Sequence, residues 1–179
     1  MRDRCYRALA RATVLAGVSS ASLTGTSSAG TNPSDTVRAF GLIGTWSRNC
    51  DIPVGTLGSS RIVYEAQKNS HASVTTTSTV TLLSPALVRV GTHFEIDSAT
   101  LLSDKQIKLV GKVTEIICPG CRNPGPPDTS PRQMIIEKVG AQIHIIDNRL
   151  LDGTAIAIDA GVVRGTGQQS SFDNKCAEL

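Results

Sequence analysis

The most constraining feature of this chain is a short stretch that contains its only tryptophan. Trp46 stands two residues after Gly44 and four residues before Cys50. A second cysteine, Cys176, stands close to the end of the sequence. A first strand that buries its tryptophan and is tied to the last strand suits a small closed β-structure. We therefore expect Gly44 and Trp46 to anchor the first strand and Cys50 to pair with Cys176.

The rest of the sequence consists of short β-branched segments separated by turn residues. Residues 71–83 are rich in Thr, Ser and Val, and Asp152-Gly153 is a dipeptide that tolerates the backbone of a tight hairpin. Residues 119–131 contain five prolines and two glycines and predict an irregular loop. We expect strands at 42–48, 61–66, 71–83, 87–97 with Gly91 as a bulge, 99–103, 106–118, 133–139, 142–146 and 155–158, followed by a short terminal segment at 171–176.

This rhythm predicts an all-β fold without an amphipathic helix. The segments are spaced as in a small antiparallel up-and-down β-barrel of about eight strands, with a sandwich as the alternative. In such a barrel the apolar side chains of alternating positions would point inward. We expect an aliphatic interior that includes Val63, Val88, Val90, Phe94, Ile96, Leu109, Ile135, Ile143, Ile145, Ile156 and Ile158.

The N-terminus has the layout of a secretory signal. Residues 1–11 carry four arginines, residues 12–23 are mostly small and apolar, and Ser27 to Gly30 are small. The alternatives are a disordered tail or a transit peptide. We expect a signal peptide at 1–30, a flexible lead-in at 31–40 and the β-barrel domain at 41–179, in a protein that is periplasmic or secreted.

Charge and composition exclude several kinds of partner. The net charge of +3 comes from the leader, because the chain without Arg2, Asp3, Arg4, Arg7 and Arg11 has equal numbers of acidic and basic residues. Aromatic residues make up 3%, too few for a platform that stacks single-stranded bases. We expect no nucleic-acid partner, no membrane span and a monomer.

Four cysteines follow the leader, an even number that suggests disulfides in an exported protein. Cys118 and Cys121 form a local pair at a turn, which leaves Cys50 for Cys176. One or both pairs could instead be reduced, and Cys118-x-x-Cys121 could hold a metal or act in redox chemistry. A redox pair needs its first thiol at a helix N-terminus, and the prolines that follow here exclude a helix.

Candidate catalytic residues do not form a known pattern. His71, His93 and His144 belong to different predicted strands, and no local signature of a Ser-His-Asp triad is present. Glu95 and Asp97 share one strand face, as exposed carboxylates commonly do. We therefore expect no catalytic residue, no cofactor and no metal site, and we predict that the protein is not an enzyme.

Two resemblances rest on the first strand. Gly44-x-Trp46 resembles the opening of lipocalin-like barrels, and the phrase from Leu42 to Ile52 is similar to the start of bacterial periplasmic inhibitors of secreted metalloproteases. Lys175-Cys176 is also similar to the end of small exported bacterial β-proteins. The resemblances imply a non-catalytic binding module for a small apolar ligand. The alternative is a protein-interaction scaffold, such as a protease inhibitor whose leading arm enters the cleft of an exported protein partner.

Overall fold

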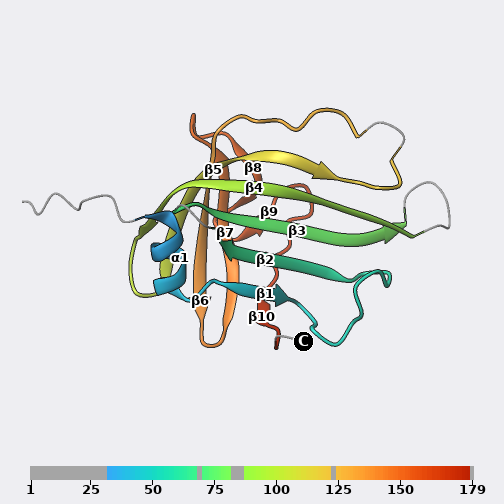
Figure 1. Ribbon diagram of the computed structural model, residues 1–179, viewed down its shortest axis with the longest axis horizontal. Helices are drawn as coiled ribbons and strands as arrows, with labels where there is room; N and C mark the ends of the chain where they lie inside the picture. Colours follow the sequence, from blue (N-terminus) through green and yellow to red (C-terminus); the bar gives the residue numbers. More distant parts are fainter. Residues whose placement is uncertain (1–31, 68–69, 82–86, 122–123, 178–179) are drawn as a thin grey trace, which may run out of the picture.

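The chain folds into a closed, eight-stranded antiparallel β-barrel, which confirms the predicted fold class (Figure 1). The computed structural model describes residues 32–67, 70–81, 87–121 and 124–177. The predicted signal peptide at 1–30 and the first residue of the lead-in lie outside the described residues. Within these ranges no helix has the length and apolar character that a membrane crossing requires.

The barrel is a meander that the last strand closes. Strands β1 to β7 each pair with the next, and β10 pairs with both β1 and β7. The strands β8 and β9 continue from β7 outside this closed ring. The strands are β1 (Gly44–Ser47), β2 (Ser60–Ala66), β3 (Ala72–Thr81), β4 (Leu87–Leu101), β5 (Gln106–Ile117), β6 (Arg132–Val139), β7 (Gln142–Leu150), β8 (Ala155–Asp159), β9 (Val162–Val163) and β10 (Asp173–Lys175).

The longest strands bend sharply where glycine lets two backbones approach. A Cβ on Gly91 of β4 would collide with the Thr76 carbonyl oxygen, and a Cβ on Gly111 of β5 would collide with that of Glu95. The pairing of β4 with β5 also shifts register at His93/Phe94 and at Ile96/Ser98. Such bulges and glycine bends curve a sheet enough to close it.

The core lies inside the barrel and includes the predicted tryptophan. Trp46 is 4% exposed, and its Nε1 donates a hydrogen bond of 2.7 Å to the Leu42 carbonyl oxygen. Of the expected interior residues, Phe94, Ile96, Leu109 and Ile143 are buried. The other buried apolar residues are Val37, Phe40, Leu42, Tyr64, Ala72, Val74, Ala99, Ile107, Val113, Met134 and Ile136.

The prediction of which residues face inward is wrong for strands β2 and β6. Val63 and Ile135 point outward, because their neighbours Tyr64 and Ile136 are buried inside. Both strands carry large apolar residues at consecutive positions, so alternation alone does not identify the inner face. Ile156 lies on β8, outside the ring, and is 37% exposed.

Residues 33–40 form a helix, so the prediction of a flexible lead-in there is wrong. Helix α1 (Pro33–Phe40) begins at Asn32, whose side chain accepts a hydrogen bond of 2.9 Å from the Ser34 backbone N–H. It ends at Gly41, whose φ of 81° is left-handed. A cap residue followed by proline at the first helical position is a known helix start.

Helix α1 covers one end of the barrel (Figure 1). Val37 is fully buried and Phe40 is 3% exposed, and the Lys138 ammonium lies 4.1 Å from the centre of the Phe40 ring. The helix has only eight residues, too few to show a clear apolar periodicity in the sequence. Because helix α1 covers this end of the barrel, a binding site would have to lie at the opposite end.

Candidate functional site

A cavity of about 300 Å³ lies at the end of the barrel opposite helix α1. The loop between β1 and β2, the last residues of β3 and the start of β10 form its walls. Hydroxyl-bearing residues dominate these walls. They are Ser47, Ser59, Ser60, Ser78, Thr79 and Ser171.

Asp173 places a buried carboxylate in this cavity. The residue is 6% exposed and lines the cavity from β10. Within the described part of the chain, no backbone or side-chain group donates a hydrogen bond to the carboxylate. Its burial raises the pKa of Asp173, and the positive charge of Arg48 partly opposes this effect. A buried charge without a donor is unfavourable unless something else pairs with it.

Tyr64 places an unsatisfied hydroxyl group inside the barrel. Its hydroxyl is buried and has no hydrogen-bond partner among the described residues. Burial, and to a lesser degree the charge of Asp173, raise the pKa of Tyr64. Because most buried polar groups in proteins are hydrogen-bonded, an unpartnered Tyr64 hydroxyl in the same interior as the Asp173 carboxylate calls for a physical explanation.

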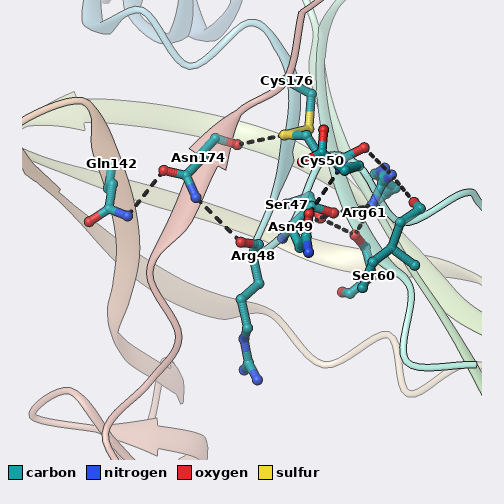
Figure 2. Close-up of a disulfide and its surroundings, with 11 residues drawn as sticks. Ser47, Arg48, Asn49, Cys50, Ser60, Arg61, Gln142, Asn174 and Cys176 are labelled. Atoms are coloured by element: carbon teal, nitrogen blue, oxygen red, sulfur yellow. Dashed lines mark hydrogen bonds between the residues drawn. A yellow bond between two sulfur atoms is a disulfide. The ribbon is translucent and has the colours of Figure 1, made fainter.

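Asn174 fixes the strand that carries Asp173. Its side-chain oxygen accepts a hydrogen bond of 3.1 Å from Gln142 of β7, and its side-chain nitrogen donates one of 3.3 Å to the Arg48 carbonyl oxygen (Figure 2). On the backbone, Asp173 pairs with Ile143 of β7. Since β10 is held on both sides, the backbone at Asp173 is fixed at the wall of the cavity.

Arg61 fixes the loop that covers the cavity. From the outer face of β2 its guanidinium donates to the carbonyl oxygens of Asn49, Cys50 and Ile52 at 3.2, 3.1 and 2.6 Å, and to Ser47 Oγ at 2.8 Å (Figure 2). The planar guanidinium suits several acceptors at once. The Arg61 guanidinium is therefore held within the protein by neutral acceptors.

The structure pairs the four cysteines as the sequence predicts. Cys50 and Cys176 are joined with a Cα–Cα distance of 5.4 Å, next to the covering loop and β10 (Figure 2). Cys118 and Cys121 are joined at 5.3 Å across a turn in which the Cys121 N–H donates to the Cys118 carbonyl oxygen. The predicted anchor Gly44 has a φ of 120°, a conformation that other residues rarely adopt.

The other predicted candidates remain apart. His71 is exposed, Asp97 is exposed and Glu95 is partly buried on β4. His93 Nδ1 lies 2.9 Å from the Thr75 hydroxyl on the neighbouring strand. In the ranges that the structure describes, no three His, Cys, Asp or Glu side chains gather in a way that could hold a metal ion.

One histidine forms a chain that the sequence analysis did not identify. His144 Nε2 lies 3.0 Å from Glu137 and Nδ1 lies 3.2 Å from Ser170, a serine–histidine–carboxylate order known from hydrolases. Ser170 is only 3% exposed, however, and its N–H donates to the Gly161 carbonyl oxygen. A nucleophile must reach its substrate, so this chain instead attaches the segment before β10, where Phe172 stacks on His144 at 4.3 Å.

Two other hollows lie on the outer wall of the barrel. The one beside the Cys50–Cys176 disulfide measures about 720 Å³, and the one along β6 and β7 about 520 Å³. Both are larger than the cavity at Asp173, but neither is lined by a buried carboxylate that lacks an ion-pair partner among the described residues. Arg61 binds carbonyl groups in the first, and Arg149 binds Asp147 and Asp159 in the second. The unpartnered carboxylate therefore makes the smaller cavity the better candidate.

Asp173, Tyr64 and Arg48 were not among the site residues predicted from the sequence. Asp173 stood within the predicted short terminal segment, and the expected link at Cys176 was the signal that could have drawn attention to it. No family model, curated protein or solved structure matches this chain. The geometry of the cavity is therefore the basis for assigning a function.

Proposed function

We propose that this protein is an exported, non-catalytic binding module that takes a small polar ligand into the open end of its barrel. The observation that carries the proposal is the buried Asp173 carboxylate, which lines a cavity and has no donor from the described residues. A ligand with a positively charged or N–H group would supply the missing partner.

The cavity also supports a size and a polarity for the ligand. Its volume of about 300 Å³ is at the lower end of the range of roughly 300–1,000 Å³ for small-molecule sites. Half of its lining residues carry hydroxyl groups, which favours a ligand with polar groups, where the sequence led us to expect an apolar one. Hydroxyl groups fix the orientation of a ligand by hydrogen bonding. Most of the lining surface is nevertheless apolar and suits a short carbon chain between the polar groups of the ligand.

Export is part of the proposal and is supported by the cysteines. Two disulfides are typical of proteins in oxidising compartments such as the periplasm or the extracellular space. The scaffold alternative has less support, because residues 33–40, which would belong to a leading arm, form a helix packed on the barrel.

The proposal is tested by titrating the oxidised, ¹⁵N-labelled protein with n-butylammonium chloride and following the amide resonances by NMR. We expect saturable shifts at Ser59, Ser60 and Ser78. Binding should be at least about tenfold weaker in Asp173→Asn, because hydrogen bonds to charged groups contribute about 1.5–3 kcal/mol. Asp97→Asn, at an exposed position of β4, is the matched control and should bind as the wild type does. Unsaturable shifts, or equal binding by Asp173→Asn, would refute the proposal.

A further inference from the structure

Arg48 brings a second, opposite charge to the cavity. It is exposed and lines the cavity from the end of β1, where Asn174 holds its carbonyl oxygen. Its side chain extends away from the disulfide, and no dashed line in Figure 2 meets its guanidinium. Among the described residues Arg48 forms no ion pair, although its charge is near enough to lower the pKa of Asp173.

The cavity thus contains a carboxylate and a guanidinium that do not bind each other. Asp173 is buried in the wall, and Arg48 lies at the exposed rim. Ser60 and Ser78 also line the cavity and are themselves joined by a hydrogen bond of 3.3 Å. This arrangement provides one acceptor for a cation, one donor group for an anion, and hydroxyl groups for the polar atoms of a ligand.

We propose that the ligand is a small zwitterion, with its ammonium group on Asp173 and its carboxylate on Arg48. This inference rests on the proposed binding function and specifies the ligand class. A guanidinium binds a carboxylate through two parallel N–H···O bonds, which gives strong and directional recognition. Amino acids and short amino carboxylates have this chemistry and fit a cavity of this size.

The charge pair also disfavours ligands that carry a single charge. A simple amine would bind Asp173 but bring its positive charge toward Arg48. A simple carboxylate would bind Arg48 but be repelled by Asp173. Specificity is the difference between two affinities and commonly includes such repulsion, so a zwitterion is the class that satisfies both residues.

The inference is tested with probes that share a carbon chain but differ in charge. The oxidised protein is titrated with 4-aminobutyrate, n-butylammonium and butyrate, and binding is followed by the same NMR resonances. Glycine and 6-aminohexanoate extend the set to a shorter and a longer charge separation. We expect the best amino carboxylate to bind at least about fivefold tighter than n-butylammonium, and butyrate to show no saturable binding.

The Arg48→Gln variant tests whether Arg48 binds the carboxylate of the ligand. It should bring the affinity for the best amino carboxylate down to that for n-butylammonium, whose own affinity should not fall. If n-butylammonium saturates the site and no amino carboxylate exceeds it, or if the advantage survives in Arg48→Gln, the zwitterion proposal is wrong and the binding function stands. If none of the probes saturates the cavity resonances, the binding function itself fails.

Discussion

The ionised Asp173 carboxylate lowers the stability of the ligand-free protein. Burial raises the pKa of Asp173 above its ordinary value of 3.8. A carboxyl group with a raised pKa in the folded state stabilises the fold below its unfolded pKa, and this contribution is lost as the pH rises through the folded pKa. At neutral pH the ionised, buried carboxylate therefore destabilises the fold.

We predict that Asp173→Asn increases the free energy of unfolding at pH 7 by on the order of 1 kcal/mol. The gain should shrink as the pH falls toward 3.8, because the wild-type side chain is then increasingly protonated in both states. Urea unfolding at pH 7 and near that value measures it, with Asp97→Asn as the exposed control. A less stable variant at pH 7 would contradict the prediction.

The same substitution separates a binding role from a structural one. If Asp173 serves the fold, its loss should lower stability and binding together. If it serves a ligand, stability should rise while affinity falls, which is the usual conflict between stability and function at a binding site.

At the level of elements, the loop between β1 and β2 depends on one side chain. The Arg61 guanidinium donates to three carbonyl oxygens of this loop. Lysine keeps the charge but presents its donors around a single nitrogen, so it cannot reach acceptors that are spread along the loop.

We predict that Arg61→Lys destabilises the protein by about 1–3 kcal/mol and speeds amide hydrogen exchange in residues 50–57. Arg89→Lys is the matched control, because Arg89 is exposed on β4 and should tolerate the change. Unchanged exchange in the loop would show that the disulfide at Cys50 holds it without Arg61.

Some secondary-structure elements were predictable from the sequence and others were not. Most strands were predictable, because β-branched runs alternate with turn residues, and so was the irregular segment at 124–131. The expected separate strand at 99–103 is wrong, because β4 continues from Leu87 to Leu101 without a turn. Helix α1 was not predictable, because its cap at Asn32 and its proline also occur in flexible segments. The inner faces of β2 and β6 were ambiguous at Val63 and Ile135.

The residues of the site could not be predicted from the sequence, for a different reason. Ser60, Ser78 and Asp173 come from β2, β3 and β10, and only the closure of the barrel brings them together. Sequence patterns report local backbone preference, whereas a cavity depends on pairings between distant segments. The one long-range feature that the sequence indicated was the pairing of Cys50 with Cys176.

At the level of the whole molecule, the barrel is closed by its shortest ring strand. Strand β10 has three residues and connects β1 with β7. So short a strand contributes few backbone hydrogen bonds. Cys176 follows it directly, and the Cys176 N–H donates a hydrogen bond of 2.8 Å to the Thr45 carbonyl oxygen. The disulfide therefore holds both the closure of the barrel and the strand that carries Asp173.

We predict that the Cys50→Ser/Cys176→Ser variant loses about 5 kcal/mol of stability on the chain-entropy model, since the bridge spans 126 residues. The Cys118→Ser/Cys121→Ser variant, whose bridge spans three, should lose only about 2 kcal/mol. Urea unfolding compares the two variants, and hydrogen exchange at Asp173 and Asn174 reports on closure. Because β10 carries Asp173, only the first variant should also lose ligand binding under conditions where it is still folded. Equal losses of stability, or intact binding in the first variant, would mean that β10 closes the barrel without its disulfide.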